Sequence, residues 1–381
     1  FGVVGVGSMG QHHIGSIKKT KNAKLTAICD IDEGKARRIG DENGVKSFTS
    51  AEKMFSSGEV DAVIIATPHY DHTPLTISAF EKDLHVICEK PIAVHKADAM
   101  KMIEAHKKHK NLKFSAMFQM RTDSLNIKLK ELIKSGALGE IYRVNWVITS
   151  WFRTQQYYNS GGWRATWKGE GGGVLLNQCP HNLDLFQWFF GMPVEMRAFC
   201  QLGRYHNIEV EDDVTAYCRY KNGSTGIFIA STGEAPGTNR LEVCADNGRL
   251  VVENGKITFN RTEMSVKEFC YTTEKMFDIP PMWNIEIPHA NELSAHQKVI
   301  QNFTNSVLED EKLLVEGEEG INSVELANAM LLSSIKEETV KIPMDASVFE
   351  KVLKSLIKSS KFVKKEVKVK NDDFSSSFSK R

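Results

Sequence analysis

The sequence predicts an α/β protein in which a doubly wound, parallel sheet is followed by an α+β domain with a large, mostly antiparallel, open sheet. A strand at the start of the chain leads into a turn with glycines at positions 5, 7 and 10, and a helical pattern follows. Strands then alternate with helices of about 10 to 15 residues as far as residue 122, which is typical of βαβ units. Beyond residue 122, Asn-Gly turns separate β segments, as in hairpins.

The first turn, Gly5-Val6-Gly7-Ser8-Met9-Gly10, has the pattern of a dinucleotide-binding (Rossmann) fold. Gly5 permits a tight turn, Gly7 lets the backbone approach a pyrophosphate, and Gly10 lets the helix pack on the strand. The amides around Ser8 and Met9 then lie at a helix N-terminus, where phosphates bind. We therefore expect these residues to bind a dinucleotide.

The second strand, residues 24–29, ends at an acidic residue, Asp30. In such folds a carboxylate about 20 to 25 positions further on binds the ribose hydroxyls of the cofactor. Because a carboxylate would repel a 2′-phosphate, Asp30 favours NAD over NADP. Asp32 is the alternative residue for this role.

The same alternation continues to about residue 122 and indicates a single domain over residues 1–122. The other expected elements are strands over 62–66, 84–88 and 113–117 and helices over 33–43, 74–82 and 96–109.

The strand over 84–88 leads into Glu89-Lys90-Pro91. Proline cannot donate to a sheet ladder, so the strand ends there. In a parallel sheet that end borders the crevice where open α/β sheets bind ligands. The Lys90 ammonium would then face a bound molecule; the simpler interpretation is a surface lysine at a strand exit.

Residues 123–360 have a different pattern and predict a second domain, and residues 361–381, rich in Lys and Ser, predict a loosely ordered tail. An antiparallel sheet is often covered on one face only, so we expect a homo-oligomer through the open face. The expected elements are a helix over 124–135, strands over 141–147, 196–202, 214–220, 225–230, 241–245 and 250–253, and amphipathic helices over 293–307 and 321–335.

Charge and cysteine usage exclude several classes of protein. The net charge is +1, which provides no general attraction to nucleic acid or to an anionic membrane, and no membrane span is visible. The seven cysteines form no C-x-x-C pair. This pattern fits reduced thiols in a cytoplasmic protein and argues against a structural zinc site.

A polar trio, Asn177, His181 and Asp184, follows the triple glycine at 171–173. If this segment is a helix, the three side chains lie on one face, with a bend at Pro180. The alternative for His181 is a packed helix histidine. His181 and Asp184 could bind a metal, but no third ligand is evident, so we predict no metal site.

Together these motifs resemble the glucose-fructose oxidoreductase, inositol dehydrogenase and MocA (Gfo/Idh/MocA) family over nearly the whole chain. The matching segments are the glycine turn, Ala66-Thr67-Pro68 followed by His72, Glu89-Lys90-Pro91, and the triple glycine with His181-x-x-Asp184. The resemblance implies a dinucleotide-binding domain, a second domain with an open sheet, and oxidation or reduction of sugars and polyols with a pyridine nucleotide.

The resemblance also implies roles for individual residues. Lys90 would contact the reacting hydroxyl and the nicotinamide ribose, and His181 would be the general acid/base, which suits a group that titrates near neutral pH. Lys90, Asn177 and His181 would bind the substrate. The positions that would line the cofactor are Thr67, Pro68, His72, Glu89, Lys90, Gln119, Trp163 and Arg164.

Asn177 departs from the family pattern, because inositol dehydrogenases carry an aspartate four residues before the histidine. An amide can bind a hydroxyl but supplies no charge to a proton relay, which weakens inositol as the substrate. We therefore predict an NAD-dependent dehydrogenase acting on a ring hydroxyl of a sugar, glycoside or polyol, specifically C3 of a glucoside. The alternatives are a sugar-to-sugar redox enzyme with bound cofactor, an inositol dehydrogenase, and a silent NAD-sensing protein.

Overall fold

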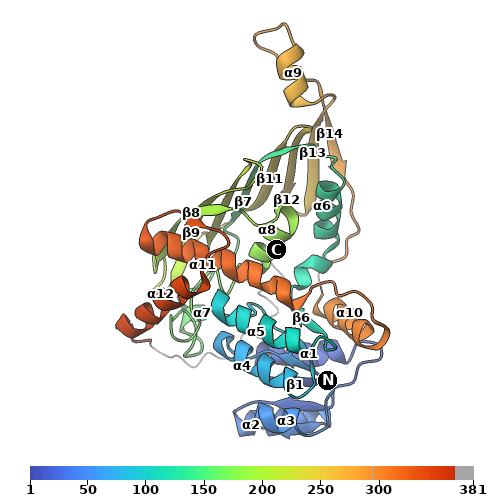
Figure 1. The fold of residues 1–381 in the computed structure, drawn as a ribbon, viewed down its shortest axis with the longest axis vertical. Helices are drawn as coiled ribbons and strands as arrows, with labels where there is room; N and C mark the ends of the chain where they lie inside the picture. Colours follow the sequence, from blue (N-terminus) through green and yellow to red (C-terminus); the bar gives the residue numbers. More distant parts are fainter. Residues whose placement is uncertain (294, 365–381) are drawn as a thin grey trace.

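The computed structural model describes residues 1–293 and 295–364. Two sheets with helices packed on them make up the structure, and the parallel sheet lies at the end opposite α9 (Val266–Thr272) (Figure 1). Most of the predicted tail at 361–381 lies outside the described residues. None of the described helices combines the length and the hydrophobicity that a membrane span requires.

Six strands in the described part of the chain form the first sheet, all parallel, in the order β3-β2-β1-β4-β5-β6. The predicted parallel sheet is confirmed. The strand order reverses between β1 and β4, and open α/β sheets bind ligands at such a point. The strands are β1 (Gly2–Val4), β2 (Ala27–Cys29), β3 (Lys46–Phe48), β4 (Ala62–Ile65), β5 (His85–Cys88) and β6 (Phe114–Ala116).

The predicted helices of this domain are present, but one begins earlier than expected. Pro74 suggested a helix start because proline is favoured in a first turn, whereas the helix begins at His69 and contains Pro74. Its first turns lie beside the cofactor loop that follows β4. The helices are α1 (Ser8–Ile17), α2 (Glu33–Asn43), α3 (Ala51–Phe55), α4 (His69–Phe80) and α5 (Lys96–Lys108).

Nine strands within the described residues form the second sheet, in the order β14-β13-β12-β11-β7-β10-β9-β8-β15. Among the strand pairs of these residues only β7 and β10 run parallel, so the predicted antiparallel character is confirmed. The strands are β7 (Ile141–Ile148), β8 (Glu195–Leu202), β9 (Glu211–Arg219), β10 (Thr225–Ser231), β11 (Asn239–Ala245), β12 (Gly248–Glu253), β13 (Lys256–Thr262), β14 (Met282–Ile287) and β15 (Val340–Lys341).

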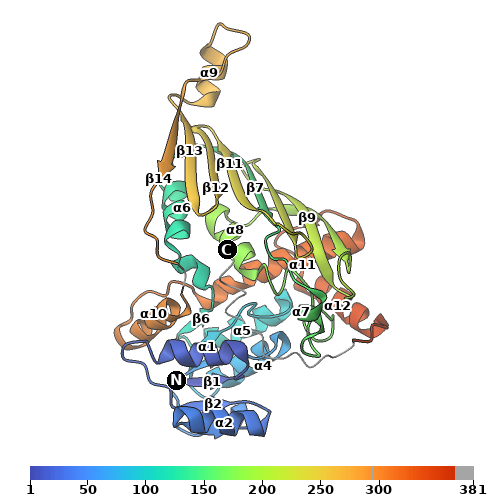
Figure 2. The ribbon, with the colours of Figure 1, turned by 180° about the vertical axis from the view of Figure 1, so that it is seen from behind.

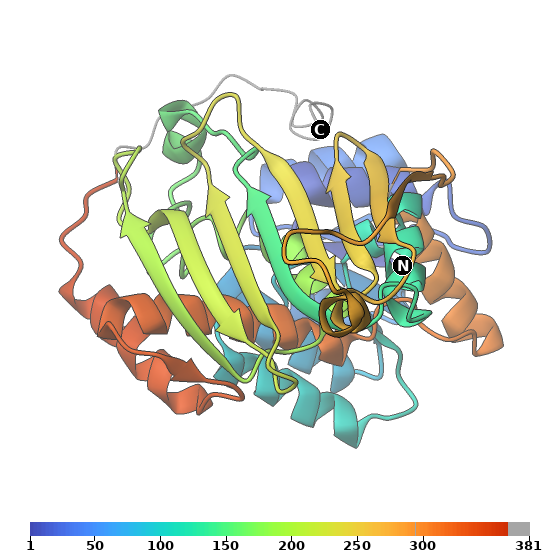
Figure 3. The ribbon, with the colours of Figure 1, turned by 90° about the horizontal axis from the view of Figure 1, so that it is seen from above.

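Helices cover one face of this sheet and leave the other open (Figure 3). Along β9, Val214, Ala216 and Cys218 are buried, while Tyr217 on the alternate face is 45% exposed. This is the alternation of a half-covered sheet. The remaining helices are η1 (Gln119–Thr122), α6 (Ser124–Lys134), α7 (Gln155–Asn159), α8 (Pro180–Phe190), α10 (His296–Glu309), η2 (Gly317–Glu319), α11 (Gly320–Lys336) and α12 (Ala346–Ser359).

Helix α10 returns to the first sheet, where it lies beside α1 (Figures 1 and 2). Ile300 and Phe303 belong to the same apolar cluster as Val3 and Ile28. The predicted domain boundaries at 122 and 360 stay predictions. They assign α10 to the second domain, although this helix packs against the first sheet. Both domains therefore depend on segments from beyond residue 290 for part of their packing.

A buried carboxylate at the start of β9 holds the triple-glycine loop. Glu211 Oε1 accepts hydrogen bonds from the amides of Gly173 (2.8 Å) and Leu175 (3.0 Å). A Cβ on Gly173 would meet the Glu211 carbonyl oxygen at 1.9 Å, so only glycine fits this approach. Burial raises the pKa of Glu211 to about 7, although its backbone hydrogen bonds act in the opposite direction.

We expect the stabilising contribution of Glu211 to depend on pH. A carboxyl whose pKa is raised on folding favours the folded state below its unfolded pKa and loses that contribution as pH rises through about 7. Glu211→Gln keeps the acceptor oxygen and removes the titration. Its free energy of unfolding should match that of the native protein near pH 5 and exceed it at pH 8 by on the order of 2 kcal/mol, as urea denaturation can measure. A difference that does not change with pH would contradict this.

Candidate active site

The glycine turn has the geometry that a pyrophosphate requires. Gly5 has φ 83°, and a Cβ there would meet the Ala66 carbonyl oxygen at 2.7 Å. A Cβ on Gly10 would meet the Gly5 oxygen at 1.9 Å, whereas a Cβ on Gly7 would meet no heavy atom within 4 Å. The turn is therefore closed toward the protein and open at Gly7, the N-cap of α1. This arrangement fits a dinucleotide at the helix N-terminus.

Asp30 lies at the carboxyl end of β2, beside this turn. Its Oδ2 accepts from the Val6 amide (3.0 Å) and its Oδ1 from the Asp32 amide (3.0 Å), and the Lys35 ammonium lies 3.4 Å away. The Lys35 ammonium donates to both carboxylate oxygens at 3.4 Å, so a ribose hydroxyl bound by Asp30 would take the place of one of these long contacts. Asp32 instead caps α2 by accepting from the Lys35 amide (2.9 Å), so Asp30 is better placed for the ribose.

The loops after β4 and β5 are joined by the buried ring of His72. Its Nδ1 lies 2.7 Å from the Pro91 carbonyl oxygen, and its Nε2 lies 2.9 Å from that of Thr67. His72 is 1% exposed, so it holds the loops after β4 and β5 together from the protein interior. Its predicted contact with the cofactor stays a prediction.

Glu89 supports the backbone of Lys90. Its Oε2 accepts from the Lys90 amide (3.0 Å), and its Oε1 lies 2.7 Å from Nε2 of the fully buried His13. Burial alone would raise the pKa of Glu89. The hydrogen bond and the charge of His13, together with the charges of His296 and Lys90, lower this pKa overall. Glu89 is thus held as a carboxylate beneath the loop rather than exposed to a ligand.

The Lys90 side chain reaches the second domain, where its Nζ donates to the Asn177 carbonyl oxygen at 2.9 Å. A helix that includes all three residues of the polar trio is not present, because α8 begins at Pro180 and Asn177 lies in the preceding turn. Proline lacks an amide hydrogen and is favoured at the first helical position, so it starts this helix instead of bending it. Asn177 and His181 therefore do not share a helix face.

His181 lies at the start of α8 and is 5% exposed. Its Nε2 is 3.3 Å from Nε2 of Gln119 in η1, and its ring packs against Phe118. The structure thus joins Gln119 to His181, and Lys90 to Asn177, across the two domains.

Asp184, the third residue of the predicted trio, points elsewhere. Its carboxylate is paired with Arg121 through two hydrogen bonds of 2.8 and 2.6 Å, and Arg121 also reaches Glu319 in η2. Both partners in the Arg121–Asp184 pair are at most 3% exposed. Asp184 is therefore not available to a metal, and within the described ranges no three His, Cys, Asp or Glu side chains are arranged to hold one.

The segment 151–170 borders the site. Trp163 lies 5.6 Å from the ring of His69, and the Arg164 guanidinium lies over the rings of Trp163 (4.6 Å) and Tyr157 (4.7 Å). Trp151, Tyr158 and Trp167 are buried in the core, so only part of the aromatic segment can meet a ligand.

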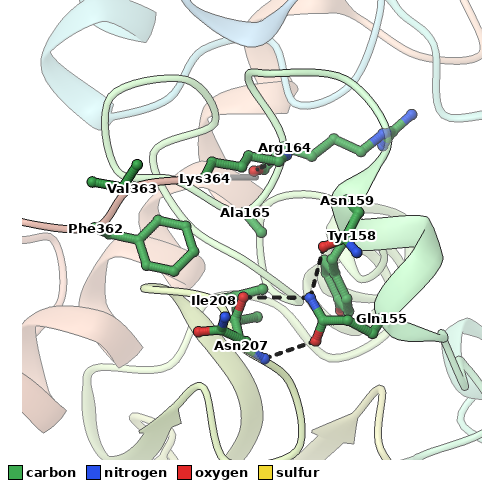
Figure 4. A pocket seen from close by; sticks show the side chains of 10 residues that line it. All are labelled: Gln155, Tyr158, Asn159, Arg164, Ala165, Asn207, Ile208, Phe362, Val363 and Lys364. Carbon is green, nitrogen blue, oxygen red and sulfur yellow. Dashed lines mark hydrogen bonds between the residues drawn. The ribbon is translucent and has the colours of Figure 1, made fainter. Parts of the chain in front are cut away.

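Lys364 anchors this segment by donating to the carbonyls of Gly161 (2.5 Å) and Arg164 (2.7 Å). Beside it, a small pocket opens between α7 and residues 362–364 (Figure 4). Neither Lys90 nor His181 lines this pocket.

Arg121, Glu170 and Glu211 contribute to the site but were not singled out from the sequence. Arg121 had one usable signal, since it follows a strand end two residues after Gln119. Glu170 directly precedes the triple glycine, and Glu211 opens an acidic run, residues 211–213, just before the predicted strand over 214–220. None of these signals identifies the partner.

Known proteins share both the sequence pattern and this fold. The model described as an oxidoreductase family with an NAD-binding Rossmann fold matches residues 1–117, and the GFO/IDH/MocA C-terminal domain matches residues 126–251. A myo-inositol 2-dehydrogenase from Thermotoga maritima is 28% identical over 268 residues, which cover 68% of this chain and 76% of that protein.

Two further relatives carry names that imply different reactions, one a hydration and the other a dehydrogenation. A 2,7-anhydro-N-acetylneuraminate hydratase from Escherichia coli is 33% identical over 194 residues, covering 50% of this chain and 49% of that protein. The structure of the WlbA dehydrogenase from Chromobacterium violaceum, in complex with NADH and UDP-GlcNAcA, is 27% identical with a TM-score of 0.77 and covers 91% of this chain and 96% of that one. The chain therefore belongs to the Gfo/Idh/MocA family of oxidoreductases, and its N-terminal domain is an NAD-binding Rossmann domain.

Proposed function

We propose that the protein is an NAD-dependent dehydrogenase that oxidises a secondary ring hydroxyl of a sugar, glycoside or polyol, specifically the C3 hydroxyl of a glucoside. The observation that carries the proposal is the 2.9 Å hydrogen bond from Lys90 Nζ to the Asn177 carbonyl. It connects the lysine of the nucleotide domain to the turn that leads into His181. We infer that His181 and Lys90 act on one bound substrate beside the ends of the cofactor loops.

The proposed chemistry divides between these two side chains. Neutral His181 accepts the hydroxyl proton, and the Lys90 ammonium stabilises the negative charge that develops on the substrate oxygen. NAD, when bound on the glycine turn, supplies the hydride acceptor. Asn177 binds a neighbouring hydroxyl through its amide.

Three observations support a cyclic, hydroxylated substrate. The relatives include a myo-inositol 2-dehydrogenase and a dehydrogenase solved with UDP-GlcNAcA. Tyr157 and Trp163 are half-buried with Arg164 between them, which gives the site a flat aromatic wall. The amide at 177, in place of the aspartate of inositol dehydrogenases, favours a glucoside over inositol. A silent NAD sensor would need neither Lys90 nor His181.

The hydratase among the relatives supports a second candidate, in which the net reaction is redox-neutral. The carbon that bears a ring hydroxyl would pass its hydride to NAD, and the C–O bond β to the resulting ketone would break by elimination to give an enone. Water would then add to that double bond, and the same hydride would return to the ketone carbon. This candidate and a sugar-to-sugar enzyme both keep the cofactor bound through turnover.

We also propose that the open face of the second sheet forms a homo-oligomer interface, because Phe199 (58% exposed) and Tyr217 (45%) lie on it.

Substrate screening tests the reaction directly. Native protein should convert methyl β-glucoside with formation of reduced nicotinamide, measured by absorbance, and should convert myo-inositol more slowly. A preference for myo-inositol would contradict the glucoside assignment. No reduced nicotinamide with any sugar, together with nucleotide that is released only on denaturation, would favour the redox-neutral candidate.

Lys90→Ala and His181→Ala should each lower kcat by roughly 10² to 10⁴, the range for a positioned acid/base or charge-stabilising group. NAD binding, measured by fluorescence quenching, should be largely retained in His181→Ala. His109→Ala is the matched control, since His109 is half-buried at the end of α5 and pairs with Asp83. Near-native turnover in His181→Ala would show that His181 is a packed helix histidine and not the acid/base group.

Cofactor choice should depend on Asp30. Native protein should bind NAD more tightly than NADP, and Asp30→Ser should narrow the difference, because it removes the repulsion of a 2′-phosphate and leaves the Lys35 ammonium nearby. Asp32→Ser is the control and should leave the ratio of the two dissociation constants unchanged. Equal affinities in the native protein would disprove the assignment.

A further inference from the structure

A buried carboxylate, Glu170, lies directly behind Asn177 and is 1% exposed. We propose that Glu170 is a positioning residue that fixes Asn177 and, through Asn177, the ammonium of Lys90. The inference rests on the proposed function for the role of Lys90. It concerns a residue seven positions before Asn177, on the other side of the triple glycine.

Both oxygens of Glu170 act as acceptors. One accepts from the Asn177 side-chain amide, and the other accepts from the backbone amide of Ala165 at 2.5 Å. Ala165 has φ 53°, a conformation that residues other than glycine seldom adopt. Burial raises the pKa of Glu170, whereas the Arg164 charge and these hydrogen bonds favour the ionised form. Two donors facing the two oxygens match a carboxylate.

The hydrogen bonds of Tyr157 give Asn177 a single orientation. The Tyr157 hydroxyl accepts from Arg164 Nη1 (2.9 Å) and Gln178 Nε2 (3.1 Å), so its one hydrogen is directed to Asn177 Oδ1, 3.3 Å away. The amide oxygen of Asn177 therefore faces a donor and its nitrogen faces an acceptor. A flipped amide would place like groups together on both sides.

The backbone of Asn177 extends the network to Lys90, whose Nζ donates to the Asn177 carbonyl at 2.9 Å. Fixing the side chain of Asn177 therefore also fixes an acceptor of the ammonium. Inositol dehydrogenases carry an aspartate at the position of Asn177, whereas in this chain position 177 is an amide that donates to the Glu170 carboxylate. The ligand side presents a neutral amide, and the negative charge lies one hydrogen bond behind it.

The network predicts that a double variant with an amide at position 170 and a carboxylate at position 177 keeps the native hydrogen bonds, whereas each single variant does not. In Glu170→Gln, one of the two donors, from Ala165 or Asn177, must face the new NH₂ group. In Asn177→Asp, two buried carboxylates face each other. In the double variant, the oxygen of the new amide at position 170 accepts from Ala165, and its nitrogen donates to the new carboxylate at position 177. The other oxygen of that carboxylate accepts from Tyr157, so every hydrogen bond of the native network again has a donor and an acceptor.

The test that needs no substrate is competitive acylation of Lys90 by acetic anhydride, read by peptide mass spectrometry with the exposed Lys24 as internal standard. Glu170→Gln should acylate several-fold faster at Lys90, and both single variants should melt at a lower temperature. The double variant should return toward native values in both. Glu211→Gln is the control, because Glu211 is buried and holds the same loop but does not contact the Asn177 side chain.

Native-rate acylation of Lys90 in Glu170→Gln would overturn the inference, as would a double variant no closer to native than the single variants. With a converted glucoside, the single variants should lose kcat more than KM. If native protein converts no glucoside, the proposed function fails, while the acylation result still decides the role of Glu170.

Discussion

The ion pair between Arg121 and Asp184 is the constraint on which the arrangement of the site depends. It joins η1, after β6, to α8, whose second residue is His181, and both side chains are almost fully buried. Removing one partner of such a pair leaves a buried charge and typically costs about 3 to 5 kcal/mol. The pair therefore fixes where α8 meets the nucleotide domain. Gln119, two residues before Arg121, is placed against His181 by the same contact.

Buried carboxylates carry out a similar task on the other side of the site. Glu211 holds the amides of the triple-glycine loop, Glu170 holds the amide of Asn177, and Glu89 holds the amide of Lys90. Each accepts hydrogen bonds from groups that must not move if a ring hydroxyl is to meet both Lys90 and His181. A low-dielectric interior strengthens such bonds and makes an unpaired group costly, so these acids favour one geometry of the loops.

Local sequence patterns predicted the parallel sheet, the glycine turn and the hairpins, because each is specified by residues close together in the chain. The edge strands β3 and β14 were not predicted, since an exposed edge needs no continuous apolar run; Lys46 and Ser47 in β3 are both exposed. The start of α8 was misplaced because Pro180 was interpreted as a bend inside a longer helix, whereas it is the first residue of α8. The partners of Asp184 and Asn177 depend on tertiary contacts, and no pattern in one sequence pairs Arg121 with a residue 63 positions away.

The proposed reaction requires that a hydride passes from a ring carbon of the substrate to NAD at the crevice between Lys90 and His181. The most direct measurement is incubation of the protein with methyl glucoside deuterated at C3, followed by mass spectrometry of the nicotinamide cofactor. We expect one deuterium in the reduced cofactor and a 3-keto product, with both absent in His181→Ala. Reduced cofactor without deuterium would place the oxidation at another carbon and contradict the assignment of C3, and deuterium recovered only in solvent would contradict hydride transfer itself.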